Sequence, residues 1–506
     1  MEKQADLYFT SDLHGYMYPT DYRGAGERDI GLFKCANRFQ KDGNTLVIDG
    51  GDVLQGSAFA AFCHESLGSA APIAQIMNEC GYDYVTLGNH DFNFGSDYLL
   101  RYLDALTGRC VCENFLTQDG AVPFPHCVRT LANGLRVGLV GIVTDHVNIW
   151  EKAEHLAGYQ ITDPFAAARQ ALEDLRGRAD VTVGIYHGGF ERDLTTGRVL
   201  SHSTENIAYR ICQELTFDIL LTGHQHMTVP GRWLFGTYVV QPADNGREFH
   251  HLRLWASEGK LAVTDELIPA GGTCDGQLLQ RFSAVEQGAQ EWMDQVVGHL
   301  AHPLRPDAPL AMAAGGSEIA ELFNRVQLHY SGAQLSAVSL ANEIAGFPQT
   351  VRRRDVLTTY PYTNTLVVVE VTGAVLRRAM ERSAEYFTLD ASGELAVSDR
   401  FLKPKVEHYN YDYFAGVTYT VDVTRPEGRR VTSLCHEGRP VADDDTFTLC
   451  MNNYRFSGAG GYPDYQSCPV VKEVNTEMWE LIMDYLEKQG GQLSLPERNY
   501  RVVWKK

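Results

Sequence analysis

The stretch ADLYFTSDLHG, residues 5–15, sets the pattern for the first half of the chain: a short apolar run ends in two side chains that can bind metal, Asp12 and His14. The pattern recurs in TLVIDG (45–50) before Asp52, YDYVTLG (82–88) before Asn89 and His90, DVTVGIY (180–186) before His187, and FDILLTG (217–223) before His224 and His226. Such runs, separated by helix-like stretches, predict an α/β domain of layered α/β architecture. Because ligand sites lie beyond the carboxyl ends of strands, we expect these segments to meet.

Seven of these side chains have the chemistry of a metal centre, with two carboxylates, one amide and four imidazoles. They are Asp12, His14, Asp52, Asn89, His187, His224 and His226. Each motif alone has an ordinary explanation as a surface acid, a turn or a core histidine, but the ordered set does not. Glycines around Asp52 leave its carboxylate room to bridge two ions. The absence of thiolate motifs disfavours structural zinc and the imidazoles disfavour magnesium and calcium, so manganese, zinc, iron and cobalt fit better.

The size and charge of the chain limit the classes of partner. Its 506 residues suffice for about two to four domains. Lys and Arg number 44 against 64 Asp and Glu, which gives a formal net charge of −20. This charge argues against a long nucleic acid or a basic membrane-binding face, and no apolar run approaches the ~18 residues of a membrane span. A small phosphorylated substrate stays compatible with it if bound metals reverse the local field.

Cysteine usage and the first residues bear on the compartment. The eleven cysteines are scattered and form no CxxC motif, which favours a reducing compartment over a disulfide framework. The opening MEKQADLYFT lacks the features of a signal peptide, so the sequence as written predicts a cytoplasmic protein, or an exported one if a leader was trimmed. The sequence does not specify an oligomeric state.

A change of pattern divides the chain into three predicted parts. Residues 1–272 carry the metal-type motifs and form the predicted catalytic domain. Apolar residues at helical spacing from Leu278 to Leu300 predict a connecting helix within a linker at 273–305. Residues 306–506 predict an α+β domain, with a helix around SEIAELFNRVQLHY (317–330) and strands such as TLVVVEVTG (365–373).

These motifs resemble a known family. In this order, DLHG, GGDVLQG, GNHDFNFG, YHGGF and TGHQH are similar to the five blocks of the calcineurin-like metallophosphoesterases, and more narrowly to the two-domain 5′-nucleotidase family. The second half also resembles that family, because YPYTNTL (360–366), YNYDYFAGVTYTVDVT (409–424) and NNYRFSGAGGYP (452–463) look like its nucleotide-binding domain. The resemblance therefore covers almost the whole chain, and its motif set is highly specific.

The resemblance implies a role for each of these residues. One metal ion would be held by Asp12, His14, Asp52 and His226, and the other by Asp52, Asn89, His187 and His224. Asp52 would bridge the two ions. In the family, a hydroxide between the metals attacks phosphorus, while the histidine that matches His90 steadies the developing charge or the leaving group.

Departures from the family pattern narrow the choice of branch. In its 5′-nucleotidases an aspartate three residues after the catalytic histidine orients that histidine, whereas this chain has Asn93. A ribose-contacting aspartate is replaced by Gly460, and no convincing match to the phosphate-side arginine motif is found. With the second-domain motifs, these features resemble the bacterial 2′,3′-cyclic-nucleotide 2′-phosphodiesterase/3′-nucleotidase branch.

In the family two aromatic rings clamp the base. The best positional matches are Tyr411 and Tyr454, with Tyr409 as a rival to Tyr411. The resemblance thus predicts a hydrolase of small nucleotides that opens a 2′,3′-cyclic nucleotide to the 3′-nucleotide and then releases phosphate. The alternatives are a 5′-nucleotidase or nucleotide-sugar hydrolase and, from another class, a non-catalytic nucleotide- or metal-sensing protein.

Overall fold

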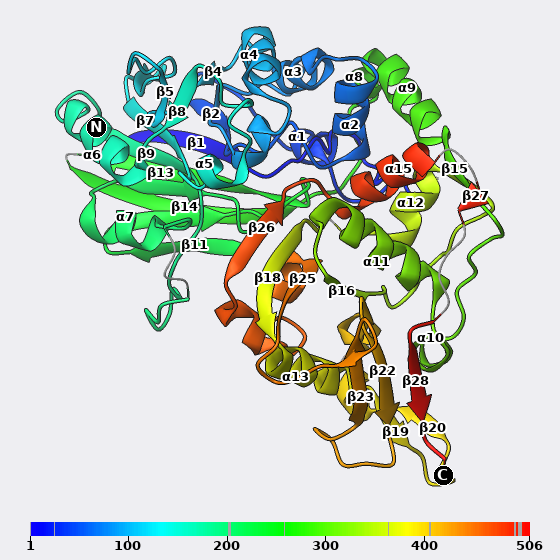
Figure 1. The fold of residues 1–506 in the computed structure, drawn as a ribbon. Coiled ribbons are helices and arrows are strands. Elements are labelled where there is room, and N and C mark those ends of the chain that lie inside the picture. Colours follow the sequence, from blue (N-terminus) through cyan, green and yellow to red (C-terminus); the bar gives the residue numbers. More distant parts are fainter. Residues whose placement is uncertain are drawn as a thin grey trace. The chain divides into compact units, whose positions relative to one another are not determined.

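The computed structural model describes residues 2–24, 26–200, 204–257, 259–362, 364–403, 406–489, 492–493 and 498–505 (Figure 1). The chain divides into two compact units, Met1–Trp292 and Met293–Lys506. None of the helices in these described ranges is both long and apolar enough to cross a membrane.

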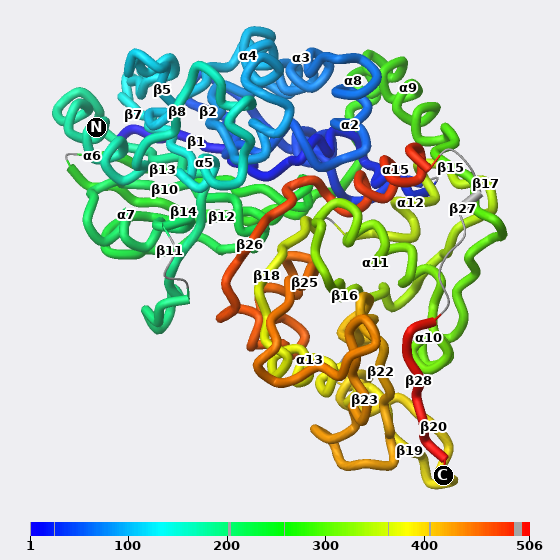
Figure 2. Tube along the Cα trace, viewed as in Figure 1, coloured from blue at the N-terminus to red at the C-terminus, as the bar shows by residue number. Residues whose placement is uncertain are grey.

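The first sheet of the first unit has six strands. Their order across the sheet is β14 (Lys260–Pro269), β13 (Glu248–Ser257), β1 (Lys3–Thr10), β2 (Thr45–Asp49), β3 (Tyr84–Val85) and β4 (Arg109–Cys110). β1 to β4 run parallel, whereas β13 pairs antiparallel with β1. In Figure 2 this return of the chain places green β13 beside blue β1. Because β1, β2 and β3 are parallel, their carboxyl ends share one edge of the sheet.

The second sheet also has six strands. Their order is β11 (Val229–Leu234), β12 (Thr237–Gln241), β10 (Ile219–Thr222), β9 (Val181–His187), β7 (Arg136–Val143) and β6 (Cys127–Thr130). The four inner strands run parallel and the two edge strands antiparallel. The carboxyl ends of β9 and β10 are therefore neighbours.

A continuous apolar core joins the two sheets. Phe9 and Ile48 of the first sheet and Val183 and Leu221 of the second belong to one buried cluster. The opposite face of the second sheet is covered by α6 (Pro164–Asp174) and α7 (Ala208–Glu214), which form another cluster with it. Asp163 precedes α6, and its carboxylate caps the first turn by accepting from the Phe165 backbone N–H. The predicted layered α/β architecture is confirmed.

Shorter elements complete the first unit. The helices α1 to α4, grouped in blue in Figure 1, are Leu32–Ala36, Ala58–Glu65, Ala71–Glu79 and Ser96–Ala105. The 3-10 helix η1 (Asn89–Phe92) follows β3. A two-stranded antiparallel sheet pairs β5 (Phe115–Thr117) with β8 (Tyr159–Ile161), and β6, β7 and α5 (Val147–Trp150) lie between them in the chain. The unit ends with α8 (Gly276–Arg281) and α9 (Ser283–Met293).

The second unit is α+β, as predicted. Its five-stranded sheet has the order β21 (Asp412–Ala415), β16 (Leu335–Ser339), β25 (Thr446–Asn452), β18 (Leu366–Thr372) and β26 (Val470–Val474). A four-stranded sheet contains β24 (Arg439–Pro440), β23 (Val431–His436), β22 (Thr418–Asp422) and β28 (Tyr500–Val503). The other strands are β15 (Val296–Leu300), β17 (Thr350–Arg352), β27 (Gln492–Leu493), β19 (Phe387–Leu389) and β20 (Leu395–Val397).

Helices cover these sheets. They are α10 (Pro309–Gly315), α11 (Glu318–Ser331), α12 (Arg353–Thr359), α13 (Gly373–Ala384), α14 (Asn453–Phe456) and α15 (Met478–Gln489). Three 3-10 turns, η2 (Asp399–Phe401), η3 (His408–Asn410) and η4 (Pro463–Ser467), lie in the loops. The expected helix around residues 317–330 is α11, which begins after the capping hydroxyl of Ser317.

The predicted connecting helix is wrong in its second half. The chain is helical in α8 and α9, but residues 296–300 form strand β15, which pairs with β17. Val296 is 49% exposed and Val297 is 2% exposed, so neighbouring side chains point to opposite faces as in a strand. β-branched residues favour this conformation, and the apolar spacing alone did not distinguish it from a helix.

Candidate dinuclear metal site

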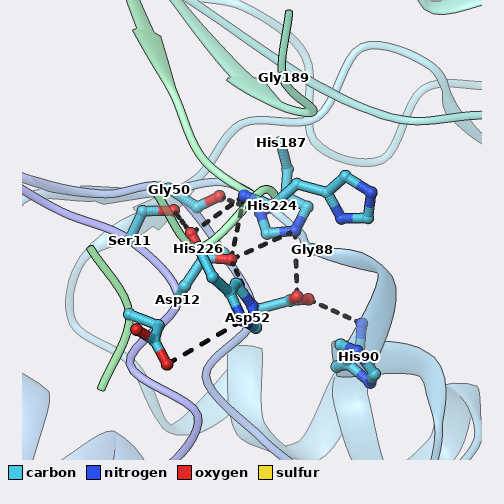
Figure 3. Close-up of polar contacts among 12 residues, drawn as sticks. Ser11, Asp12, Gly50, Asp52, Gly88, His90, His187, Gly189, His224 and His226 are labelled. Carbon is cyan, nitrogen blue, oxygen red and sulfur yellow. Dashed lines mark hydrogen bonds and ion pairs between the residues drawn. The ribbon is translucent and has the colours of Figure 1, made fainter. Parts of the chain in front are cut away.

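The carboxylate and imidazole ligands that the sequence predicts come together, and Figure 3 labels five of them: Asp12, Asp52, His187, His224 and His226. Asp12 and His14 follow β1, Asp52 follows β2, Asn89 begins η1, His187 ends β9, and His224 and His226 follow β10. Ligand atoms of one group lie within 4.8 Å of one another, and the group consists of Asp12, His14, Asp52 and His226. A second group within the same limit consists of Asp52, His187 and His224. Asp52 belongs to both groups, which is the arrangement that a bridging carboxylate requires.

The backbone at these positions is in a costly conformation. Nine non-glycine residues of the described part have positive φ, and five of them are predicted ligands: Asp12, His14, Asp52, His224 and His226. This left-handed region disfavours side chains with a Cβ, and such outliers cluster at functional sites. The turn after each of three strands therefore bends sharply enough to point a side chain back across the sheet edge.

Close backbone contact fixes Asp52 relative to the loop of Asn89 and His90. A Cβ added to Gly88 would lie 2.1 Å from Oδ1 of Asp52, so only glycine fits there. The His90 backbone N–H donates to that same Oδ1 over 2.7 Å. The loop of Asp52 and the loop of Asn89 and His90 can approach this closely only because position 88 has no side chain.

Asp91 holds the same two loops together. Its carboxylate accepts from the backbone N–H groups of Gly88, Asp52, Val53 and Leu54 at distances of 2.8 to 3.0 Å. Burial raises the pKa of Asp91 to about 6, and the nearby charge of Asp52 adds to the shift. The residue stands in the GNHDFNFG motif, but the motif alone predicts no separate role for it.

Second hydrogen bonds orient the imidazole rings. Nδ1 of His14 donates to the carbonyl of Gln55 over 2.8 Å, and Nδ1 of His187 donates to the carbonyl of Gly50 over 2.7 Å. With Nδ1 protonated in each neutral ring, Nε2 carries the lone pair. Nε2 of His14 lies 2.9 Å from Nε2 of His226, so both rings point at the same small volume.

The buried polar atoms fit a pair of divalent cations. Oδ1 of Asn89 is buried without a hydrogen-bond partner, and Oδ2 of Asp52 and Nε2 of His187 form a buried ion pair over 3.1 Å. An orphaned buried atom such as Oδ1 of Asn89 costs about 1 to 3 kcal/mol, which a bound cation would relieve. All three atoms belong to predicted ligands, and their mixed oxygen and imidazole chemistry suits a transition metal better than magnesium or calcium.

The charges of the site are strongly coupled. Burial would raise the pKa of Asp52, but the charge of His187 outweighs it and holds that pKa well below its usual range. Burial would lower the pKa of His187, but Asp52 raises it to about 10. In the same way Asp12 raises the pKa of His226 to about 9 against the effect of burial. Burial, with the charge of His226, lowers the pKa of His14 to about 4.

His90 stands at the border of this cluster. Its ring centre lies 5.4 Å from that of His14, and its Nδ1 donates to Oδ1 of Asn93 over 2.8 Å. Nε2 is then the ring atom left for a substrate. The predicted pairing of His90 with Asn93 is therefore present in the geometry.

Two residues outside every quoted motif also contact the site. Oε1 of Glu205 lies 2.8 Å from Nε2 of His224, and the ring of Trp150 stacks on His224 with centres 5.5 Å apart. A carboxylate behind a ligand histidine orients the ring and raises its basicity. Glu205 and Trp150 both lie many positions before His224 in the sequence, where no motif signals them.

The predicted tyrosines lie in the second unit and differ in environment. Tyr454 is 40% exposed, whereas Tyr411 is 4% exposed and its hydroxyl donates to the carbonyl of Ala313. The Tyr411 ring packs in T-shaped contact on Tyr413 with centres 4.9 Å apart. A ring held in this way has no face for a base, so the structure argues against Tyr411 as a stacking residue.

Tyr409, the rival, is the residue beside Tyr454. Their ring centres are 6.4 Å apart and their planes meet at 68°, so one ring must turn before the two can clamp a base. Tyr362 is close to both, and burial with the two neighbouring hydroxyls raises its pKa to about 12. Arg455, which is 3% exposed, donates to the carbonyl of Tyr409 and forms an ion pair with Asp412 over 2.8 Å. This buried guanidinium therefore fixes the backbone that carries both rings.

Known protein families match both halves of the chain. The family model described as calcineurin-like phosphoesterase matches residues 6–228, and the 5′-nucleotidase C-terminal domain matches residues 296–467. A candidate 5′-nucleotidase from Staphylococcus aureus, solved with α-ketoglutarate, is 32% identical, with a TM-score of 0.73 over 99% of this chain and 100% of that chain.

Two curated relatives extend the comparison. The trifunctional nucleotide phosphoesterase protein YfkN of Bacillus subtilis is 26% identical over 98% of this chain, which spans only 38% of that relative's length. A 2′,3′-cyclic-nucleotide 2′-phosphodiesterase/3′-nucleotidase of Yersinia enterocolitica is 25% identical over 89% of this chain and 81% of its own length.

Fold, ligand cluster and relatives define a metal-dependent hydrolase of phosphoric esters. The chain belongs to the two-domain 5′-nucleotidase family of calcineurin-like metallophosphoesterases.

Proposed function

We propose that the protein hydrolyses 2′,3′-cyclic nucleotides to 3′-nucleotides and then hydrolyses these to a nucleoside and phosphate. The observation that carries the proposal is the pair of ligand groups that share Asp52, with His90 beside them. The name of the Yersinia enterocolitica relative supports the substrate class.

Each of the two steps consumes one water. In the first step water oxygen bonds to phosphorus, the bond from phosphorus to O2′ breaks, and a proton ends on O2′. In the second step another water breaks the bond from phosphorus to O3′ in the same way. Both steps therefore need an activated water on one side of phosphorus and a stabilised leaving oxygen on the other.

The residues of the first unit divide this work. Two ions of manganese, zinc, iron or cobalt, held by the two ligand groups, would activate water and neutralise the phosphoryl oxygens. Asn93 keeps Nδ1 of His90 occupied, which leaves Nε2 to stabilise the charge on the leaving oxygen. Asp91 keeps Asp52 and His90 in register through the backbone bonds of both loops.

Tyr409 and Tyr454 are the proposed base-binding pair. Ring stacking contributes about 1 to 3 kcal/mol per base and distinguishes poorly between bases. Such a pair suits an enzyme that accepts several nucleosides. In this pair Tyr409 takes the place of Tyr411, whose ring is buried.

Gly460 favours the cyclic and 3′-nucleotide branch over a 5′-nucleotidase. Its φ is +74°, and a Cβ there would lie 2.2 Å from Nη1 of Arg455 and 2.3 Å from Oδ1 of Asn410. An aspartate that contacts ribose at this position would displace the buried Arg455. The chain is therefore built without that carboxylate, which is a departure from the 5′-nucleotidases of the family.

Product analysis tests the proposal. We would incubate the protein with 2′,3′-cyclic AMP, 3′-AMP or 5′-AMP, with manganese or with a chelator, and resolve nucleotides, nucleoside and phosphate. We expect 3′-AMP as the intermediate, adenosine as the end product, and complete loss with the chelator. His90→Ala should lose about 100-fold or more in kcat while it keeps its metal.

The same panel separates the alternatives. Preferred hydrolysis of 5′-AMP would replace the proposal with a 5′-nucleotidase. A nucleotide sugar, added as a fourth substrate, tests the nucleotide-sugar hydrolase in the same way. Release of 2′-AMP from the cyclic substrate would contradict the proposed bond cleavage.

A further inference from the structure

Glu151 is joined to His90 through the side chain of Asn93. Nδ1 of His90 donates to Oδ1 of Asn93 over 2.8 Å, and Nδ2 of Asn93 donates to Oε2 of Glu151 over 2.7 Å. The Glu151 side chain is only 7% exposed, although the residue follows the short helix α5 in a loop. A buried carboxylate thus stands two hydrogen bonds away from the ring that faces the substrate.

The position of Glu151 is itself fixed. Its Oε1 accepts from Nδ1 of His155 over 2.7 Å and from the backbone N–H of Lys152 over 2.9 Å. The carbonyl of His155 accepts from the backbone N–H of Ser96, the first residue of α4. Because Ser96 comes three residues after Asn93, this second attachment ties the Glu151 loop to the segment that carries Asn93.

The carboxylate matters because an asparagine amide has two unlike ends of similar shape. If the NH2 end faced His90, Nδ1 would have to be an acceptor and the ring could not hold a proton there. If the oxygen faces His90, Nδ1–H is held and the ring can also carry a positive charge. An ionised carboxylate is only an acceptor, so it binds the NH2 end and leaves the oxygen for His90.

We propose that Glu151 is a positioning residue for phosphoester hydrolysis, which orients the Asn93 amide so that its oxygen holds Nδ1 of His90. An aspartate at position 93 would need no such partner, because both of its oxygens accept. The chain therefore combines a neutral residue beside His90 with a charged residue behind it. The inference rests on the role of His90 in the proposed function, but not on which nucleotide is the substrate.

The first test removes the partner. Glu151→Ala should lower kcat roughly 10-fold on any phosphoester that the wild type hydrolyses, with KM and metal content within about twofold of the wild type. Glu154→Ala is the matched control, because Glu154 is an exposed acid of the same segment. In a His90→Ala background, Glu151→Ala should cause no further loss. Unchanged kcat in Glu151→Ala, or an equal loss without His90, would overturn the proposal.

The second test exchanges the charge. Asn93→Asp alone places two carboxylates in contact and should lower both kcat and the unfolding midpoint. In the double variant Asn93→Asp/Glu151→Gln, the glutamine amide can donate to the introduced carboxylate, so both quantities should rise above those of Asn93→Asp alone. If the fold-loss in kcat of the double variant equalled the product of the losses of the two single variants, the orienting role would be contradicted.

The unfolding midpoints are measured on metal-free protein, which makes them independent of turnover. If the midpoints follow the expected pattern but no nucleotide is hydrolysed, the proposed function fails and the contact between positions 93 and 151 stands. If turnover is as proposed but the double variant is not restored, the role of Glu151 fails alone.

Discussion

Nε2 of His14 and Nε2 of His226 face each other at 2.9 Å, although 212 positions separate the two residues in the chain. Two lone pairs at this distance repel, so one ring must carry a proton or both must bind a common cation. The pKa values decide the metal-free case, because that of His14 is lowered to about 4 and that of His226 is raised to about 9. At neutral pH His226 therefore donates to His14, and a metal ion has to displace that proton.

Metal affinity should consequently rise with pH. His187 and His226, with pKa values of about 10 and about 9, are protonated in the metal-free protein at pH 7 and must lose their protons to bind metal. Manganese should bind more tightly as the pH rises from about 6 to about 9, with release of about two protons per site pair. Calorimetry in buffers of different ionisation enthalpy measures this number. A pH-independent affinity would show that these rings are not ligands.

Gly88→Ala should destroy the site without unfolding the unit. The new Cβ would lie 2.1 Å from Oδ1 and 2.3 Å from the backbone nitrogen of Asp52, so the carboxylate shared by both groups must move together with its loop. We expect loss of about 100-fold or more in kcat and of bound metal. Gly276→Ala is the control, because nothing lies within 4 Å of the Cβ that it adds. Full metal content and activity in Gly88→Ala would rule out the proposed placement of Asp52.

The two environments of the tyrosines predict different phenotypes. Tyr454→Ala removes a stacking face and should raise KM for nucleotides roughly 10-fold while kcat stays close to that of the wild type. Tyr411→Phe removes a buried hydroxyl that bonds to the carbonyl of Ala313 and to Tyr500, so it should cost about 1 kcal/mol of unfolding free energy and leave KM unchanged. Steady-state kinetics and thermal unfolding of both variants check this. If instead Tyr411→Phe raised KM and Tyr454→Ala did not, Tyr411 would be the base contact.

Glu321 should make the second unit less stable as pH rises. Burial raises its pKa in the folded protein to about 7, above the ordinary value of 4.5. The folded state therefore keeps a proton that the unfolded state gives up between these values, and the free energy of unfolding falls across this window. Between about pH 5 and about pH 8 the unfolding midpoint of Glu321→Gln should fall less than that of the wild type. Glu318→Gln, an exposed acid of the same helix, is expected to fall as the wild type does.

Sequence patterns predicted most of the metal site because its geometry follows from strand direction. Asp12 and Asp52 follow two neighbouring parallel strands of one sheet, and His187 ends a parallel strand of the other, so each side chain lies at the carboxyl edge of its sheet. The reach of these side chains is short, so few other arrangements of them exist.

Other features depend on contacts that leave no local pattern. Tyr409 and Tyr411 are only two residues apart in the sequence, yet their environments differ. The 3-10 turn η3 lies between these environments, and no periodic pattern of apolar residues predicts it. Strand β15 has the same apolar spacing as the end of a helix, and its pairing with β17 decides between them. Glu205 contacts His224 and Glu151 contacts Asn93 from distant loops, and only the folded chain shows these contacts.

The left-handed backbone at five residues lowers the stability of the folded protein while it places the metal ligands. These residues are Asp12, His14, Asp52, His224 and His226. Glycine at any one of them would relieve about 1 to 2 kcal/mol of steric cost. Laboratory evolution that selects only for thermostability should therefore substitute these five positions early, and would yield a more thermostable protein without catalytic activity.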